Sequence, residues 1–187
     1  MPTRCFGDGD PTYAAYHDHE WGRPVTDERH LLELICLEGF QAGLSWRTIL
    51  LRRNAFREVF ADFDPERVAA FTPADVERLL GDPRIIRHRG KIEAVIANAR
   101  ATLALRGTAS PLPQLVWSFR PEPGPAPTAW SAIPAATDAS RALAKALRKA
   151  GFRFFGETTA YATMQAAGLV NDHLASCPVR AAIAAAR

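Results

Sequence analysis

The chain has 187 residues, of which 48% are hydrophobic, and its 23 Lys and Arg against 20 Asp and Glu give a formal net charge of +3. This size and composition suffice for a globular domain with a substantial core, and we expect a single domain over residues 1–187. No apolar stretch is long enough to span a membrane, and the weak positive charge permits a polyanionic partner without requiring one. With three cysteines and no hydrophobic segment typical of a secretion signal, we expect a reducing, cytoplasmic environment, in which cysteines bind metal or fill the core.

Helix signals begin soon after the N-terminal segment. Thr26, followed by two acidic residues, is typical of an N-cap and predicts a helix that runs to about Gly39. Ser45 predicts a second helix start. The apolar side chains at helical spacing behind it are Trp46, Ile49, Leu50 and Phe56.

Two later dipeptides, Asp64-Pro65 and Thr72-Pro73, place proline directly after a capping side chain, which predicts two more helix starts. A further helix, beginning near Lys91, presents one apolar stripe with a period of about 3.6 residues. The stripe consists of Ile92, Val95, Ile96, Ala99 and Leu103.

A proline-rich segment, residues 107–139, interrupts the helical pattern. It predicts a long loop that is anchored to the core by residues 116–119. Helices return over about 140–150 and 158–167, each followed by a glycine. Because no alternating pattern of strand length occurs, the sequence predicts an all-α fold.

Candidate metal ligands lie at the two ends of the chain. Cys5 and His17 are near the start, and His173 and Cys177 are near the end. Each pair is close enough in sequence to form half of a metal site, and together the pairs would make a closed tetrahedral Cys2His2 set with no open position for catalysis. From spacing alone, unrelated buried side chains are the more common explanation.

The segment 82–91 joins two predicted helices and is strongly basic. Arg84, Arg87, Arg89 and Lys91 surround Gly90. Backbone N–H groups at the start of the following helix would face an anion, and the positive charge would favour phosphate whatever the base sequence. The segment therefore predicts contact with a nucleic-acid backbone, and a solvated basic turn is the alternative.

Aromatic side chains with polar tips occur on both sides of one carboxylate. Tyr13, Tyr16 and Trp21 lie upstream, Glu38 ends an apolar helix, and Trp46 opens the next helix. Tyrosine and tryptophan offer a stacking face and a hydrogen-bonding group, and a buried carboxylate suits a cationic or amino-bearing ring. These residues predict a pocket for a planar heterocycle; ordinary core packing is the alternative, and we prefer it for Tyr13.

A series of runs along the chain, taken together and in order, closely resembles the 3-methyladenine DNA glycosylase I family. The resemblance covers nearly the whole chain and is weakest in the proline-rich segment and the last ten residues. The runs are Tyr16-His17-Asp18, Glu20-Trp21-Gly22, Cys36-Leu37-Glu38-Gly39, Gln41-Ala42-Gly43-Leu44-Ser45-Trp46, Ile85-Ile86-Arg87-His88-Arg89-Gly90-Lys91-Ile92 and Gly168-Leu169-Val170-Asn171-Asp172-His173.

The resemblance implies a helix-hairpin-helix DNA glycosylase fold with a zinc site that joins the N- and C-terminal segments. One structural zinc ion would be bound by Cys5, His17, His173 and Cys177. The hairpin would contact the DNA backbone. The hairpin residues concerned are Arg87, Arg89, Gly90 and Lys91.

The resemblance also implies a base pocket formed by Glu38, Tyr16 and Trp46, with Trp21 as a further wall. The chain departs from the family at Phe6, because family members often have tryptophan shortly after the first cysteine. Phe6 can still stack on a base, but it lacks the indole N–H.

The implied activity is DNA repair by hydrolysis of the N-glycosidic bond of 3-methyladenine in alkylated double-stranded DNA. A monomeric enzyme would flip the base into the pocket and leave an abasic site without cutting the strand. Because methylation at N3 makes the base cationic and weakens its bond to deoxyribose, a strong general acid is unnecessary. Two alternatives remain: a non-catalytic helical DNA-binding module, and a zinc hydrolase in which water displaces one ligand.

Overall fold

The computed structural model describes residues 4–185, and over these residues it contains helices and no β-strand. The predicted all-α fold class is confirmed. Within the same range, no helix has both the length and the apolar character that crossing a membrane requires. The helices are α1 Pro11–His19, α2 Glu28–Gln41, α3 Trp46–Leu50, α4 Arg53–Val59, α5 Pro65–Ala69, α6 Pro73–Gly81, α7 Arg89–Arg106, α8 Leu112–Trp117, α9 Asp138–Lys149, α10 Glu157–Ala166 and α11 Arg180–Ala185, with short 3-10 helices η1 Ala61–Phe63 and η2 Trp130–Ala132.

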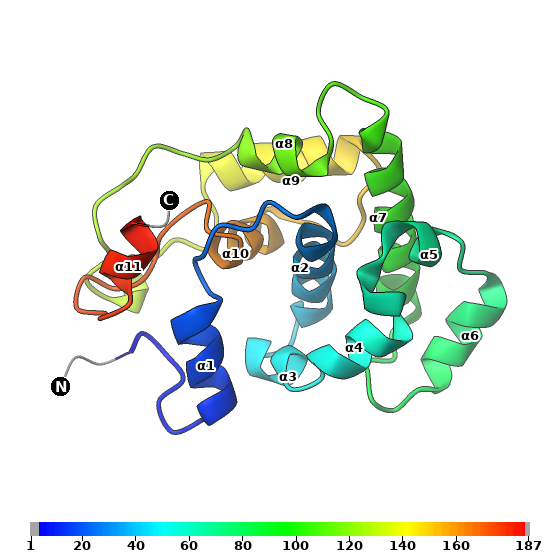
Figure 1. The fold of residues 1–187 in the computed structure, drawn as a ribbon, viewed down its shortest axis with the longest axis horizontal. Coiled ribbons are helices and arrows are strands. Elements are labelled where there is room, and N and C mark those ends of the chain that lie inside the picture. Colours follow the sequence, from blue (N-terminus) through cyan, green and yellow to red (C-terminus); the bar gives the residue numbers. More distant parts are fainter. Residues whose placement is uncertain (1–3, 186–187) are drawn as a thin grey trace.

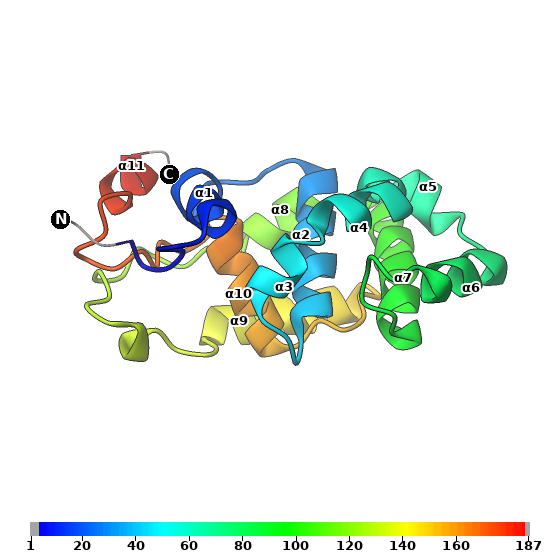
Figure 2. The same ribbon diagram turned by 90° about the horizontal axis from the view of Figure 1, so that it is seen from below.

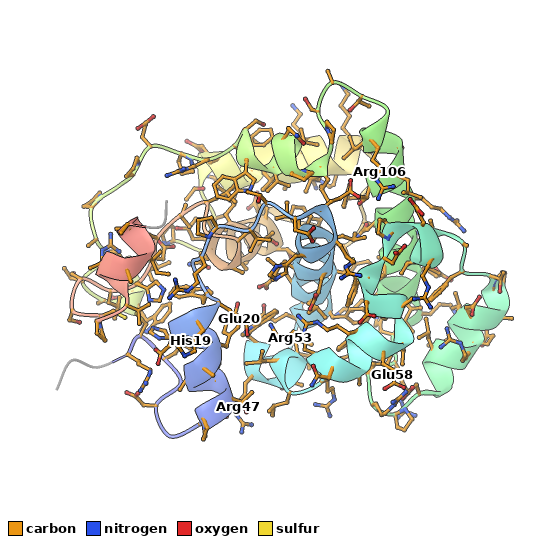
Figure 3. All side chains as sticks on the ribbon, in the orientation of Figure 1. His19, Glu20, Arg47, Arg53, Glu58 and Arg106 are labelled. Carbon is orange, nitrogen blue, oxygen red and sulfur yellow. The ribbon has the colours of Figure 1, made fainter. Side chains whose placement is uncertain are left out.

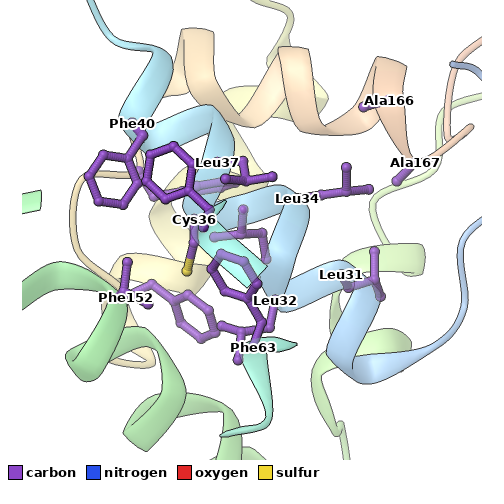
Figure 4. Close-up of a cluster of buried hydrophobic side chains, with 14 of the residues drawn as sticks. Leu31, Leu32, Leu34, Cys36, Leu37, Phe40, Phe63, Phe152, Ala166 and Ala167 are labelled. Carbon is purple, nitrogen blue, oxygen red and sulfur yellow. The ribbon is translucent and has the colours of Figure 1, made fainter. Parts of the chain in front are cut away.

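Helix α2 lies at the centre of the molecule, between the end formed by α1 and α11 and the end formed by α5, α6 and α7 (Figures 1 and 2). It packs against α3, α7, α8 and α10. Its residues 31–40 are all buried, so α2 is enclosed on every side, as expected of a helix with apolar residues around its whole circumference. Leu32 and Leu37 of α2 and Phe63 of η1 belong to the core cluster shown in Figure 4. Side chains on α2 are therefore held by a rigid, close-packed core.

The starts of α2 and α3 are set by capping side chains. Asp27, rather than the predicted Thr26, caps α2, because its carboxylate accepts a hydrogen bond from the N–H of His30 at 2.8 Å. Ser45 caps α3 as predicted, by accepting from the N–H of Thr48 at 3.2 Å. The predicted single helix after Ser45 is two helices, because the chain turns at residues 51–52 and Phe56 lies in α4.

The proline signals are confirmed. Asp64 caps α5, and Thr72 forms a capping box with Asp75 at the start of α6. Helix α7 begins at Arg89, two residues before the predicted start, and is capped by His88.

The proline-rich segment is more ordered than the predicted loop, because it contains α8 and η2. Proline is tolerated in the first turn of α8, where the backbone N–H has no helical partner. The expected anchor at residues 116–119 is confirmed: Val116 is fully buried, and the indole N–H of Trp117 donates to the carbonyl oxygen of Val25 at 2.7 Å.

The segment before α2 packs tightly on the end of α10. Gly168 has φ +77°, and a Cβ there would lie 2.6 Å from the carbonyl carbon of Arg23, so only glycine fits. The N–H of Val25 donates to the carbonyl oxygen of Ala167 at 3.1 Å. This contact brings α1 and α11 to the same end of the molecule (Figure 1).

Candidate functional site

The four predicted metal ligands meet in one buried cluster. The ligand atoms of Cys5, His17, His173 and Cys177 all lie within 4.8 Å of one another. The Sγ of Cys177 is 3.5 Å from Nε2 of His17 and 3.4 Å from Nδ1 of His173. Zinc bonds of about 2.3 Å to sulfur and about 2.0 Å to nitrogen give edges of about 3.5 Å at the tetrahedral angle. The donor set and its geometry therefore fit a tetrahedral metal ion.

The second nitrogen of each histidine has its own acceptor. Nδ1 of His17 lies 2.8 Å from the carboxylate of Asp18, and Nε2 of His173 lies 3.0 Å from the carbonyl oxygen of Trp21. An N–H donated to each acceptor leaves the other ring nitrogen free to bind metal. Burial lowers the pKa of His173 to about 4, so its imidazole is neutral, as a metal ligand must be.

The Cys2His2 cluster and the aromatic residues form one continuous unit. Tyr16 precedes the ligand His17 on α1, and the Trp21 ring lies 4.6 Å from that of His173. The ring of Phe6 is 5.1 Å from that of Trp21 and 6.3 Å from that of Tyr16. Trp21 and Phe6 thus connect the cluster to the predicted pocket.

Trp130 also belongs to this unit, although no sequence pattern indicates it. Its indole N–H donates to the carbonyl oxygen of Cys5 at 2.8 Å, and its ring lies 6.0 Å from that of Phe6. Trp130 comes from η2 in the proline-rich segment, 125 positions away from Cys5, so no local spacing pattern could have indicated the contact.

Glu38 is buried without a hydrogen-bond partner for Oε2 among the described residues. Burial raises the pKa of this carboxyl group to about 8. A buried polar atom without a partner costs about 1–3 kcal/mol, and such atoms in a native fold call for an explanation such as a bound ligand. The indole N–H of Trp46 is also buried and has no partner in the described part of the chain.

Three helices bring the predicted pocket residues together. Tyr16 comes from α1, Glu38 from α2 and Trp46 from α3, and all three are buried. The rings of Tyr16 and Trp46 have centroids 5.4 Å apart. The pKa of Tyr16 is raised well above its usual value, chiefly by burial and then by the nearby charge of Glu38. The site therefore combines two aromatic rings with a carboxyl oxygen and an N–H that lack hydrogen-bond partners among residues 4–185.

Two ion pairs fix α1 relative to α3 and α4. No local sequence pattern predicts them, because the partners are 33 and 37 positions apart. Both carboxylate oxygens of Glu20 accept from Arg53, at 2.5 and 2.8 Å, so the pair is bidentate (Figure 3). Arg47 of α3 pairs with Asp10, the N-cap of α1. These pairs hold the wall that carries Tyr16 against the wall that carries Trp46.

The predicted basic hairpin connects α6 to α7 through residues 82–88. Arg87 has no hydrogen bond or ion pair to any described residue, so its charge is available to a partner. Arg84 and Arg89 are instead paired within the protein: Arg84 binds Asp82 and Glu58, each at 2.8 Å, and Arg89 binds Glu77 at 2.6 Å. These exposed pairs are weak and leave the arginines able to exchange partners.

Gly90 and Lys91 begin α7 beside the loop after α9. A Cβ on Gly90 would lie 3.3 Å from the side chains of His88 and Phe154, so the close approach favours glycine. Lys91, which was predicted to contact the DNA backbone, directs its side chain toward the end of α2. Its ammonium group donates to the carbonyl oxygens of Phe40 and Ala42.

Comparisons with known proteins agree with this arrangement. A sequence model of the methyladenine glycosylase family matches residues 6–181. The chain is 55% identical over 171 residues to DNA-3-methyladenine glycosylase 1 of Escherichia coli, covering 90% of this chain and 91% of that protein.

Solved structures give the same result. A crystal structure of 3-methyladenine DNA glycosylase I superposes with a TM-score of 0.91 at 53% identity, covering 94% of this chain and 98% of the other. The Staphylococcus aureus enzyme, whose structure describes the recognition of 3-methyladenine, superposes with a TM-score of 0.89 at 38% identity and covers 94% of this chain and 95% of its own. The predicted resemblance is confirmed, and the chain belongs to the methyladenine glycosylase family of enzymes, which hydrolyse N-glycosyl bonds.

Proposed function

We propose that this protein excises 3-methyladenine from alkylated double-stranded DNA by hydrolysing the N-glycosidic bond. The observation that carries the proposal is the buried Oε2 of Glu38, which has no partner among the described residues and lies near Tyr16, whose ring is 5.4 Å from that of Trp46. A flipped adenine would supply hydrogen-bond donors for the carboxylate and a face for the indole ring. The names of the related proteins support this choice of base.

The charge of the lesion matches the electrostatics of Glu38. With a pKa of about 8, the carboxyl group of the free protein is largely protonated at neutral pH. The cationic 3-methyladenine base favours the ionised carboxylate, which can then accept hydrogen bonds from the exocyclic amino group. Neutral adenine gives no such compensation for burying the charge, so the site discriminates in favour of the alkylated base.

Departure of the base requires little acid catalysis. The methylated base leaves as a neutral molecule, so Glu38, Tyr16 and Trp46 have to bind and orient it rather than protonate it. Water then attacks the anomeric carbon and gives free 3-methyladenine and an abasic site.

Strand cleavage through an imine is not part of this mechanism. The lysine of the hairpin, Lys91, has its Nζ bound to the carbonyl oxygens of Phe40 and Ala42. An ammonium group in these contacts is not a free amine nucleophile. We therefore infer a monofunctional glycosylase.

We propose that the α6–α7 hairpin binds the DNA backbone. Arg87 supplies a charge without a partner among the described residues, Arg89 supplies an exchangeable one, and Gly90 lies in the first turn of α7, where backbone N–H groups would face a phosphate. This is the helix-hairpin-helix element implied by the resemblance. We take residues 1–187 to be one glycosylase domain that acts as a monomer.

We propose zinc as the metal of the Cys2His2 cluster. Two thiolates and two imidazoles in a tetrahedral arrangement are the usual ligands of structural zinc. Cys5, His17, His173 and Cys177 would hold the ion and leave no open position for water, so its contribution is to position residues such as Tyr16. This closed set disfavours the zinc hydrolase.

One assay tests the function directly. Methylated duplex DNA is incubated with the purified protein, the released bases are identified, and the product strand is tested for intactness. We expect free 3-methyladenine and an intact strand that carries an abasic site. A DNA-binding module would release no base, and that result would refute the proposal.

A further inference from the structure

The side chain of Lys91 enters the protein interior although it belongs to the basic hairpin. Only 8% of the residue is exposed, and Nζ donates to the carbonyl oxygen of Phe40 at 2.9 Å and to that of Ala42 at 2.7 Å. Burial lowers the pKa of Lys91, so the two carbonyl contacts replace water that the ammonium group has lost. The charge of Lys91 therefore serves a site within the protein.

The two acceptors lie at the C-terminal end of α2. The last carbonyl groups of a helix have no helical partner and form the negative end of its dipole, so a cation there is favourable. Glu38 lies in the same last turn of α2, which ends at Gln41, and Ala42 is the C-cap. Lys91 thus donates hydrogen bonds to free carbonyl groups at the end of α2, the helix that carries Glu38.

A short loop that begins at Ala42 connects α2, which carries Glu38, to α3, which begins at Trp46. Gly43 has φ +84°, and Leu44 is 40% exposed before Ser45 starts α3. We name residues 42–45 the pocket loop. One of the two acceptors of Lys91 is the first residue of this loop, so Lys91 fixes where the pocket loop begins.

The other end of Lys91 lies in the hairpin. Its backbone follows Gly90 in the first turn of α7, and its N–H approaches Nδ1 of His88 at 3.2 Å. Lys91 therefore spans the distance between the element proposed to bind phosphate and the loop that leads into the pocket.

We propose that Lys91 is a positioning residue, which couples binding of the DNA backbone at the hairpin to the placement of the pocket loop against the duplex. When the DNA backbone binds at the start of α7, the contacts of Lys91 with the carbonyl oxygens hold the pocket loop in a fixed position relative to the bound DNA strand. The lesion is then extruded where Glu38 and Trp46 can bind it. The proposal rests on the proposed glycosylase function and assigns to Lys91 a role other than phosphate contact.

The test compares Lys91→Met, which keeps the length and loses the charge, with Lys91→Arg, which can still donate to both carbonyl groups. Lys145→Met, on an exposed position of α9, is the matched control, and Arg87→Gln is the reference for loss of a phosphate contact. Single-turnover excision from methylated duplex, the salt dependence of binding to undamaged duplex, and binding of free 3-methyladenine are measured at a temperature where all variants are folded.

We expect Lys91→Met to lower the single-turnover rate about tenfold or more, with recovery to within about threefold of wild type in Lys91→Arg. The slope of log affinity against log salt should stay unchanged, whereas Arg87→Gln should reduce it by about 0.9. Free 3-methyladenine should bind with an affinity within about threefold of wild type, because the pocket itself is intact.

Three results would overturn the proposal. A salt slope reduced in Lys91→Met would make its ammonium group a phosphate contact. An unchanged excision rate would remove any positioning role. Joint loss of free-base binding and excision, without recovery in Lys91→Arg, would show a merely structural residue. Failure of the wild-type protein to release 3-methyladenine would instead refute the proposed function, whatever the variants do.

Discussion

At the scale of single residues, the pocket is defined by polar groups that the fold buries without satisfying. Oε2 of Glu38 and the indole N–H of Trp46 have no partner among the described residues, and both residues are less than one-tenth exposed. A fold optimised for stability alone would not retain two such atoms close to one aromatic ring. The stability lost by burying these two atoms without partners is recovered when a ligand with complementary groups binds. The same two atoms therefore make the site selective for such a ligand.

Replacing Glu38 by Gln should separate recognition from folding. The amide keeps the shape but accepts only neutral hydrogen bonds, which contribute about 0.5–1.5 kcal/mol each, whereas hydrogen bonds to a charged group contribute about 1.5–3 kcal/mol. We expect excision of 3-methyladenine to fall by about 10- to 100-fold. Far-UV circular dichroism should be unchanged, and undiminished release of the base would rule out the assigned role of Glu38.

The raised pKa of Glu38 also predicts a dependence of stability on pH. In the folded state the group has a pKa of about 8, against an unfolded value near 4.5. The contribution of its protonated form is complete below about pH 4.5 and is lost as the pH rises to about 8, because the unfolded chain releases the proton first.

The measurement compares wild type with Glu38→Gln, which does not titrate. Between about pH 5 and pH 8, the free energy of unfolding of wild type should fall relative to the variant by about 1 kcal/mol per pH unit. Denaturant titrations at several pH values check this, and a difference independent of pH would show that Glu38 is ionised in the folded protein.

At the scale of elements, the site depends on side chains that form hydrogen bonds with the free backbone groups at helix ends. Lys91 donates to two carbonyl oxygens at the end of α2, and His88 of the hairpin caps the start of α7. Helices α1 and α4 are joined by the pair between Glu20 and Arg53. Helix ends supply directed N–H and C=O groups, so fixing their positions also fixes the residues nearby.

The hairpin should bind DNA through charge and without regard to sequence. Arg87→Gln is expected to weaken binding to damaged and undamaged duplex alike and to lower the salt slope by about 0.9. Arg106→Gln, at the opposite end of α7 and paired with Glu28 and Glu66, is the control and should leave the slope unchanged. An effect of Arg87→Gln restricted to lesion-bearing DNA would place this arginine in base recognition instead.

At the scale of the whole molecule, the Cys2His2 cluster joins segments that are 168 positions apart, as between Cys5 and His173. The same end of the molecule carries Tyr16, Trp21 and Phe6. Joining the N- and C-terminal segments through the cluster therefore also positions one wall of the pocket. Closing so large a loop costs chain entropy, which bonds to a metal ion would offset.

Cys177→Ala should abolish stoichiometric metal binding and lower the melting temperature by about 5–10 °C. Cys36→Ala is the matched control, because Cys36 is equally buried but lies in the core near Asn98, away from the cluster. Metal analysis and thermal unfolding check both variants. Full metal content in Cys177→Ala would exclude this residue from the ligand set.

The sequence alone determined features that depend on neighbours a few residues away. Capping by Ser45, Asp64 and Thr72 follows from side chains that reach the next turn, so these helix starts were predictable. The residue types and their spacing indicated the candidate site residues, but the resemblance to a family was needed to join Cys5 and Cys177 in one site, since they have no local relation to each other.

Tertiary structure alone decided which partner each side chain takes. The acceptors of Lys91 lie 51 and 49 positions away in sequence, so its inward direction was not visible in a basic run that suggests an exposed cation. Likewise, Trp130 reaches Cys5 from the proline-rich segment, where a loop without helices was expected. The physical reason is the same in each case: local sequence sets the backbone, whereas burial and long-range packing select the contacts that satisfy a charged or polar side chain.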